Sequence, residues 1–343
     1  MSAAPDFTVV IPTYRRRDSL ERVLHGLASQ EWPSERLEVI LVSDGGHDGS
    51  VEMARSFPLP FQLRAVEQQN QGPAAARNLG LAQATRPFVL FLDDDVVPCP
   101  RLVAEHARSH GEADDRVVIG TMLEAPAPLQ PWVRWEARML AEQYRAMENG
   151  VFAPTPWQLY TGNVSVRTEH LRRAGGFDPA LKRAEDIDLG FRLRDLGCEF
   201  VFNAAAAGLH YASRSYRSWI EAAHQYGRND ILFGKAEERV AGEFRHRHPI
   251  TRALVRWGVR HRRAASGLTT LAEPVIRAAY RLELWPLASQ LCGGAFNLAY
   301  WLGVCDQVGS VGEALCLAEL GSPPGLKSRA RSTLPIGRRS GRQ

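Results

Sequence analysis

The sequence has few cysteines, and their spacing excludes two common kinds of stabilised domain. There are five, at positions 99, 198, 292, 305 and 316, and no two of them form a CxxC pair. An odd number without close pairs argues against a disulfide framework and against a structural zinc site. The first residues also lack the pattern of a secretory signal peptide. We therefore expect a protein of the reducing cytoplasm.

The first two-thirds of the chain lack the basic excess that is typical of nucleic-acid-binding proteins. The net charge is only +4 over 343 residues. Residues 244–272 contain seven arginines and no acids, and residues 327–343 contain six basic residues and no acids. The basic character therefore belongs to the C-terminal third, and we expect no nucleic acid among the partners.

Strand and helix patterns alternate along the first hundred residues. Short apolar runs at 7–11, 37–42, 61–66 and 88–92 predict strands, and the runs at 37–42 and 88–92 are apolar enough for burial on both faces. Helical spacing of apolar residues at 18–27 and an alanine-rich stretch at 73–84 predict helices between them. This alternation predicts an α/β protein with a doubly wound, mostly parallel, Rossmann-like sheet.

Polar clusters follow three of these predicted strands. They are Thr13-Tyr14-Arg15, Asp44-Gly45-Gly46 and Asp93-Asp94-Asp95. Ligands of such sheets bind outside the carboxyl ends of the strands. The three clusters are therefore expected to meet in one crevice.

The acidic triplet is the strongest of the three signals. Three adjacent carboxylates repel one another unless a positive charge lies among them. Side chains alternate along an extended chain, so Asp93 and Asp95 are expected to point to the same side, with Asp94 directed elsewhere. Two such carboxylates suit a divalent cation that bridges to phosphates. The alternative is a solvated acidic loop that caps a helix.

Asp44 and Arg77 are weaker candidates. The Asp44 carboxylate can accept hydrogen bonds from a nucleobase, and the glycines after it would let a ligand approach the backbone; alternatively, it belongs to a simple Asp-Gly turn. Arg77, within the predicted helix at 73–84, suits a phosphate group, or it is an ordinary surface arginine.

Seven sequence segments together resemble family 2 glycosyltransferases, which adopt the GT-A fold. They are FTVVIPTYRR, VILVSDGGHDGS, NQGPAAARNLG, FVLFLDDDVVP, TGNVSVR, GGFDP and AEDIDLGFRLRDLG, in this order over about residues 6–235. The first four resemble the family's nucleotide-binding half. One departure is small, because Ser43-Asp44-Gly45-Gly46 stands where the family often has Asp-Asp-Gly-Ser.

The resemblance implies a role for each matching residue. Pro12, Thr13 and Tyr14 would line the nucleotide pocket, and Asp44 would accept the N3–H of uracil or thymine. Arg77 would lie near the diphosphate. Asp93 would contact ribose or metal, with Asp94 beside it in the donor site, and Asp95 would bind the Mn²⁺ or Mg²⁺ ion that bridges the phosphates. His210 is a further candidate ligand for the metal or the diphosphate, although a structural role is as reasonable.

Glu185 and Asp186 match a Glu-Asp pair of the family. In its inverting members the aspartate of that pair is the general base, a group that contributes about 10² to 10⁴ in rate. Asp188 is a rival for this role. The alternative for Asp186 is stabilisation of a helix N-terminus, where a carboxylate is favourable.

We expect a catalytic domain over residues 1–240, with a nucleotide-sugar-binding half at 1–120 and an acceptor half at 121–240. A helical, basic extension would follow at 241–325, and a disordered basic tail at 326–343. Arg252, Arg256, Arg260 and Arg263 recur at helical spacing and predict one basic face opposite Leu254, Val255 and Val259. Such a helix suits either an anionic membrane surface or the surface of the catalytic domain. The uncharged stretch 284–305 predicts a buried or interfacial helix, with membrane insertion as the alternative.

The sequence therefore predicts an inverting, metal-dependent transfer of sugar from a UDP- or dTDP-sugar to a glycan or lipid-linked acceptor. It would occur in the cytoplasm or at the inner face of the cell membrane. A nucleotidyltransferase is one alternative, but Pro12-Thr13-Tyr14 stands where a glycine-rich signature with Arg and Lys is typical. An inactive nucleotide-binding protein at a membrane surface is another, and the intact Glu185-Asp186 pair disfavours it.

Overall fold

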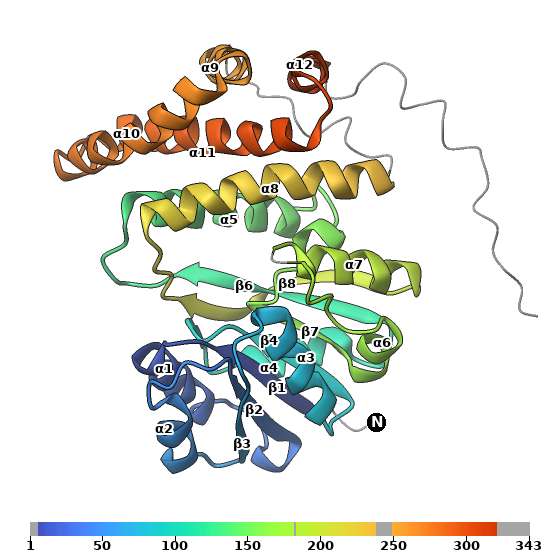
Figure 1. Ribbon diagram of the computed structural model, residues 1–343. Coiled ribbons are helices and arrows are strands. Elements are labelled where there is room, and N and C mark those ends of the chain that lie inside the picture. The colour runs from blue at the N-terminus through green and yellow to red at the C-terminus, as the bar shows by residue number, and fades with distance from the viewer. Residues whose placement is uncertain (1–5, 182, 238–248, 321–343) are drawn as a thin grey trace, which may run out of the picture. The chain divides into compact units, whose positions relative to one another are not determined.

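The computed structural model describes residues 6–181, 183–237 and 249–320. The chain divides into two compact units, Met1–Ser215 and Tyr216–Gln343 (Figure 1). The domain boundary predicted near residue 240 and the predicted tail at 326–343 lie outside the described residues. Both remain predictions.

Eight strands of the described chain form one sheet in unit 1, in the order β3-β2-β1-β4-β7-β6-β8-β5. The strands are β1 (Phe7–Thr13), β2 (Leu37–Ser43), β3 (Gln62–Glu67), β4 (Phe88–Leu92), β5 (Val96–Pro98), β6 (Arg116–Glu124), β7 (Asn163–Arg167) and β8 (Glu199–His210). Strands β1 to β4 pair in parallel, β6 is parallel to β8, and β5 and β7 are antiparallel to their neighbours. The predicted mostly parallel α/β sheet is confirmed.

The helices of unit 1 lie between these strands along the chain. They are α1 (Arg17–Ala28), η1 (Ser34–Arg36), α2 (Ser50–Ser56), α3 (Pro73–Gln83), α4 (Leu102–His110), α5 (Pro131–Glu148), η2 (Pro156–Gln158), α6 (Thr168–Arg173) and α7 (Glu185–Asp195). The predicted helices at 18–27 and 73–84 correspond to α1 and α3, and α2 and α4 were not predicted. Strand β8 is 12 residues long, and His210 is its last residue.

Burial on both faces of the sheet explains the apolar runs. Phe7, Val9 and Ile11 of β1 pack in one cluster with residues of α1, α2 and α4. Val10, between them, packs in a second cluster with residues of α3, α6 and α7. Alternate side chains of a strand point to opposite faces, so a strand buried on both sides must be apolar throughout. At the carboxyl ends of β1, β2 and β4 the apolar runs end, and polar residues follow.

Unit 2 consists of helices with a core of their own. Its described helices are α8 (Tyr216–Glu237), α9 (Pro249–Arg260), α10 (Arg262–Arg281), α11 (Trp285–Gln307) and α12 (Val311–Leu320). Helices α8 and α11 approach closely through two glycines. A Cβ at Gly227 would lie 1.9 Å from the carbonyl oxygen of Tyr300, and one at Gly303 would lie 1.9 Å from that of His224. A larger residue at either glycine would force the two helices apart.

The predicted single basic helix face is wrong, because the chain breaks between α9 and α10. His261, with φ −121° and ψ 54°, separates the helices, so Arg263 belongs to α10 and not to the face of Arg256 and Arg260. Val255 and Val259, the predicted apolar side, are buried in the core of unit 2.

The uncharged stretch at 284–305 forms most of α11, many of whose side chains are buried. In the described part of the chain no helix is long and apolar enough to cross a membrane.

Candidate functional site

The acidic triplet forms a turn directly after β4. The backbone N–H of Val96 donates to the carbonyl of Asp93 over 3.1 Å, and the chain then enters β5. The expectation that Asp93 and Asp95 share one side assumed an extended chain and is wrong for that reason. The turn instead places Asp94 and Asp95 on a common partner, the guanidinium of Arg16.

Two arginines and a histidine surround the triplet, each from a different element. Arg16, directly before α1, contacts Asp95 and lies 3.3 Å from Asp94 Oδ1. Nε2 of His210 lies 3.4 Å from Asp95 Oδ1. Arg77 of α3 donates from Nη2 to Asp93 Oδ1 over 3.0 Å. The mutual repulsion of the three carboxylates is therefore offset by the protein itself.

The three carboxylates differ in their tendency to ionise. Burial raises the pKa of Asp94 to about 7, although Arg16 and a 2.7 Å hydrogen bond from the Thr13 hydroxyl favour the charged form. Burial also opposes ionisation of Asp95, but His210 and Arg16 hold the pKa of Asp95 well below its usual range. The triplet therefore offers one firmly anionic carboxylate, Asp95, beside one that titrates near neutrality.

Arg77 joins the acidic triplet to the Glu185-Asp186 pair. Its Nη1 donates to Glu185 Oε1 over 2.9 Å, while Nη2 donates to Asp93. The Arg77 side chain is only 7% exposed. A buried guanidinium with a carboxylate on each side fixes the spacing of both partners, because its donors form a rigid fork. Two clusters that lie about ninety residues apart in the sequence are thus brought to one place.

Asn78, the next residue of α3, holds the loop that leads to α7. Its amide donates to the carbonyl of Phe177 over 2.7 Å and accepts from the N–H of Phe177 over 2.8 Å. Gly176, directly before Phe177, has φ +68°, and a Cβ at Gly176 would lie 2.5 Å from Asn78 Oδ1. Glycine is needed at this position both for its left-handed backbone and for the contact. Both residues therefore position the start of α7, Arg77 through Glu185 and Asn78 through the backbone of Phe177.

Asp186 lies in the first turn of α7. Its Oδ1 accepts the N–H of Ile187 over 2.9 Å. Burial and then the neighbouring charge of Glu185 raise the pKa of Asp186 to about 7, a value suited to a general base that works near neutral pH. The rival base Asp188 is committed to Arg192, whose Nε and Nη2 lie 3.0 and 2.5 Å from Asp188 Oδ2. Of the two aspartates, Asp186 is therefore the better candidate.

Asp44, at the end of β2, binds the loop that precedes α3. Its carboxylate accepts from the Gln68 side chain over 2.8 Å and from the backbone N–H groups of Gln71 and Gly72 over 2.9 and 2.8 Å. A carboxylate has about four lone-pair sites, so these protein groups occupy three of them. Gly45, the residue after Asp44, is needed for packing within the protein, because a Cβ at this position would lie 3.0 Å from the backbone nitrogen of Asn70.

The remaining predicted nucleotide-site residues lie at the end of β1. Pro12 and Thr13 belong to the strand, and Thr13 contacts Asp94 as described. Tyr14 follows the strand and is 42% exposed, with the Arg15 guanidinium 5.1 Å from its ring centroid. Tyr14 therefore presents an accessible aromatic face at the same sheet edge as the triplet.

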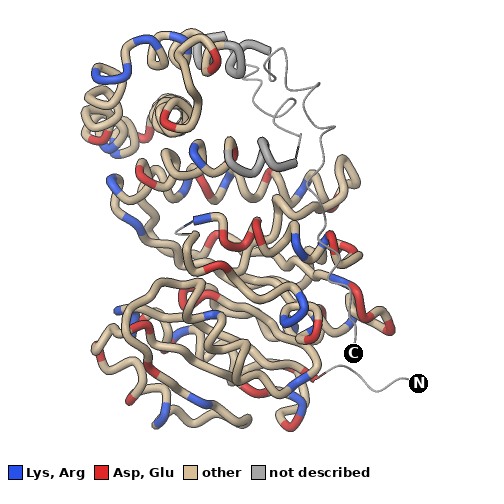
Figure 2. The backbone as a smooth tube through the Cα atoms, turned by 45° about the vertical axis from the view of Figure 1, so that its right-hand side comes forward, with Lys and Arg blue, Asp and Glu red and all other residues tan. Residues whose placement is uncertain are grey.

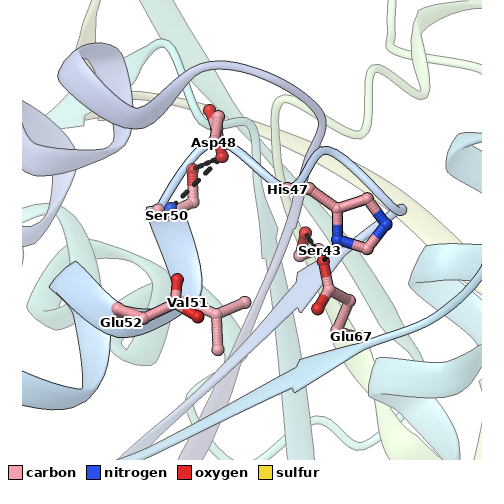
Figure 3. A pocket seen from close by; sticks show the side chains of 8 residues that line it. Ser43, His47, Asp48, Ser50, Val51, Glu52 and Glu67 are labelled. Carbon is pink, nitrogen blue, oxygen red and sulfur yellow. Dashed lines mark hydrogen bonds and ion pairs between the residues drawn. The ribbon is translucent and has the colours of Figure 1, made fainter.

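A pocket of about 290 Å³ lies beyond the end of β2 (Figure 3). Among its lining residues, His47 Nδ1 lies 3.2 Å from Glu67 Oε1, and the Ser43 hydroxyl lies 3.4 Å from the same oxygen. Asp48 accepts two hydrogen bonds from Ser50. Three of the eight lining residues are acidic, so the lining is unsuited to a diphosphate. Neither Asp44 nor the acidic triplet belongs to it.

The predicted metal ligands Asp93, Asp95 and His210 are only partly brought together. Within the described ranges, no group of three His, Cys, Asp or Glu side chains is arranged to hold a metal ion. Asp95 and His210 form a pair, whereas the third predicted ligand, Asp93, is bound to Arg77. Mg²⁺ is commonly held by one or two carboxylates together with substrate phosphates. Such an ion would require Arg16 to leave Asp95.

Sequence reasoning missed two residues of this site. Arg16 is one of three consecutive arginines that follow Tyr14 just after β1, at the same sheet edge as the triplet, and that position was the available signal. Asn78 stood beside Arg77 in the quoted segment, but its partner Phe177 lies 99 residues away. Only the folded chain reveals that contact.

The comparisons with known proteins agree with this architecture. A family model described as Glycosyl transferase family 2 matches residues 8–172. These residues, just under half of the chain, are similar to glycosyl transferase family 2. The family 2 region contains β1 to β4, Asp44, Arg77 and the acidic triplet. Glu185, Asp186 and His210 lie beyond the matched residues, so their connection to the family 2 region rests on the contacts of Arg77 and Asp95.

One relative and two solved structures define the extent of the similarity. Over 236 residues the chain is 30% identical to the validoxylamine A glucosyltransferase of Streptomyces hygroscopicus subsp. jinggangensis, and the match covers 61% of this chain and 56% of that protein. The chain thus spans about half the length of this curated relative. The mannosyltransferase PcManGT from Pyrobaculum calidifontis, solved with GDP-Man and Mn²⁺, has a TM-score of 0.59 at 19% identity and 87% coverage of both chains. S. aureus TarS 1–349 with UDP-GlcNAc has a TM-score of 0.50 at 18% identity, covering 87% and 90% of the two chains. These likenesses show the fold, and the predicted GT-A type is confirmed.

Proposed function

We propose that the protein is a glycosyltransferase that moves a sugar from a UDP- or dTDP-sugar to a hydroxyl of a glycan or lipid-linked acceptor, with inversion at the anomeric carbon. The observation that carries this proposal is the buried Arg77, which links Asp93 in the family 2 region to Glu185, the neighbour of Asp186. Donor-side and acceptor-side carboxylates are thereby held together, as a direct displacement requires.

Asp186 is proposed as the general base. Its carboxylate takes the proton of the acceptor hydroxyl as the hydroxyl oxygen forms a bond to the anomeric carbon. The bond from that carbon to the diphosphate oxygen breaks, and its electron pair leaves with the diphosphate. The raised pKa of Asp186 supports this role, because a carboxylate with a pKa near 7 accepts a proton more readily than one near 4.

The donor would lie at the carboxyl ends of β1, β2 and β4. Tyr14 and Asp44 are proposed to bind the nucleobase, the latter through its remaining lone pair. Arg16 contacts Asp95, a carboxylate that a cation bound to the diphosphate would also contact. Asp95 and His210 would hold a Mn²⁺ or Mg²⁺ ion, which when bound offsets charge on the leaving diphosphate. The presence of GDP-Man and Mn²⁺ in the Pyrobaculum calidifontis structure is consistent with this arrangement.

The acceptor and its place form a further part of the proposal. Residues 244–272 contain seven arginines and no acids, a composition that favours an anionic membrane surface. A lipid-linked acceptor would be found there. This would place the reaction at the inner face of the cell membrane.

The proposal is tested by separating donor binding from transfer. A thermal-shift screen of nucleotide sugars, with and without Mn²⁺ or Mg²⁺, identifies the donor, because a ligand that binds the native state raises its stability. With that donor, Asp186→Asn should keep the thermal shift and lose transfer, whereas Asp95→Ala should lose the metal-dependent part of the shift. Asp195→Asn, on the exposed end of the same helix α7, is the control and should retain both.

Two results would contradict the proposal. One is full transfer by Asp186→Asn with a confirmed donor and acceptor. The other is a thermal shift in wild-type protein without donor hydrolysis or transfer under any metal condition, which would leave a nucleotide-binding protein without turnover.

A further inference from the structure

Helix α10 carries an apolar face that the rest of the described chain does not cover. Leu268, Leu271 and Val275 are 42%, 69% and 52% exposed. At 3.6 residues per turn these three side chains fall within roughly 60° of one another around the helix. Single exposed apolar residues are ordinary on protein surfaces, but an aligned row of them is not.

A neighbouring side of α10 is buried. Ala265, Thr269, Ile276 and Ala279 are buried; the first three are turned away from the exposed row, while the small Ala279 lies beside Leu268 around the helix. The apolar side of α9 is likewise buried, as the core cluster with Val255 shows. The exposed row is therefore surplus to the packing within unit 2.

Further exposed apolar residues lie in the turn between α10 and α11 and in the first turn of α11. Leu282, Leu284 and Leu287 are 70%, 47% and 45% exposed, and Trp285 is 38% exposed, with its ring against Tyr280 at a centroid distance of 4.5 Å. Tryptophan and leucine at such a corner suit the boundary between lipid chains and headgroups, where an amphipathic ring is favoured. Glu283 is the acidic residue within this turn.

The charge around this row favours an anionic partner. Arg260, Arg263 and Arg281 are all exposed, at the end of α9 and at the two ends of α10. Blue segments mark arginines along these helices in Figure 2. Glu273, on α10 itself, is paired with Arg277 over 2.8 Å. Basic residues near an anionic membrane surface favour binding to it.

We propose that the row Leu268-Leu271-Val275 and the α10–α11 turn form a docking surface for a bilayer that contains anionic lipids. Apolar side chains enter the headgroup boundary, and the flanking arginines contact the lipid phosphates. This assignment differs from the predicted basic face of α9, whose apolar side is used inside unit 2. A second copy of the chain would need a complementary acidic face, whereas the excess of arginine favours lipid.

The test measures vesicle binding by the full chain, without donor or acceptor, so its outcome is separate from that of the proposed transfer reaction. Wild-type protein should cosediment with phosphatidylcholine vesicles that contain phosphatidylglycerol, and less with pure phosphatidylcholine. Leu271→Glu should lower the partition coefficient at least ten-fold. The matched control is Thr270→Glu, which adds the same charge to the neighbouring exposed position off the apolar row, and its effect should be less than three-fold.

Three outcomes would overturn the assignment. They are wild-type protein that stays in solution with anionic vesicles, equal effects of Leu271→Glu and Thr270→Glu, and a change of oligomeric state in Leu271→Glu without a change in vesicle binding. The last outcome, read by light scattering after gel filtration, would assign the row to contact between copies. Leu271 is mostly exposed, so its substitution should leave the melting temperature unchanged, and this is checked in the same samples.

Discussion

Replacement of Arg77 by methionine should destabilise the protein strongly, because it leaves two carboxylates without their cation. Methionine keeps most of the apolar stem and removes only the guanidinium. The side chains of Glu185 and Asp93 are 11% and 34% exposed, so the loss falls mainly on Glu185. Loss of one partner of a buried ion pair typically costs 3–5 kcal/mol. Since Asp93 is partly solvated, we expect the lower end, about 3 kcal/mol in the free energy of unfolding at pH 8.

The pH dependence of this loss has a definite sign. Burial disfavours the charged form of a carboxylate that has lost its cation, so Arg77→Met should be most destabilising where such carboxylates are charged in the folded protein. The penalty is absent at low pH, where the carboxyls are protonated in both the folded and the unfolded state, and it grows as the pH rises and they lose their protons. The deficit should therefore be smaller at pH 5 than at pH 8.

Urea unfolding followed by circular dichroism measures the effect, and a second substitution tests its cause. Glu185→Gln in the Arg77→Met background removes the unpaired charge and should recover about half of the loss. Arg17→Met removes an exposed arginine that pairs only loosely with Asp18, over 3.7 Å, and should cost less than about 1 kcal/mol. The reasoning is refuted if Arg77→Met loses less than about 1 kcal/mol at pH 8, or if Glu185→Gln gives no recovery.

Three further predictions concern the base, the α7 loop and the core. The kcat/KM of the wild-type protein should rise with pH through about 7 as Asp186 loses its proton, and Asp186→Asn should lower kcat by about 10² to 10⁴; a pH profile from 5.5 to 9 that is flat would contradict the first part. Asn78→Ala removes both hydrogen bonds to the Phe177 backbone and should cost about 1–3 kcal/mol in thermal unfolding; an unchanged melting temperature would show that the loop does not need them. Burial lowers the pKa of His106 to about 4 and that of His110 to about 3, so the free energy of unfolding should fall as the pH drops from 6.5 toward 4; this slope should become shallower in His110→Phe, and an equal slope would refute the assignment.

The core histidines show why part of the molecule was beyond sequence reasoning. His106 bonds Ser165 and Asn163 at 2.8 Å each, and His110 bonds the same Ser165 at 2.8 Å. These partners lie 55 to 59 residues away along the chain. Nothing in the local pattern of residues 102–110 distinguishes a buried histidine from a surface one, and the helix that carries both was not predicted.

The sequence alone determined the sheet and the position of its polar edge. Strands buried on both faces must be apolar throughout, so β1, β2 and β4 are visible as runs, and the clusters at Thr13, Asp44 and Asp93 stand where those runs end. This information is local. It sufficed for the fold class, whereas the choice of Asp186 as a candidate base came from the resemblance to family 2 glycosyltransferases.

Tertiary structure decided which charges meet. The alternation of side chains along an extended chain predicted Asp93 and Asp95 on the same side. In the structure the chain turns after β4, so Asp93 contacts Arg77, whereas Asp95 contacts Arg16 and His210. It also decided which apolar face of the C-terminal helices is buried and which is left exposed. Pairings of this kind depend on elements that are distant in the chain and close in space, and a periodic pattern in one segment carries no record of its partner.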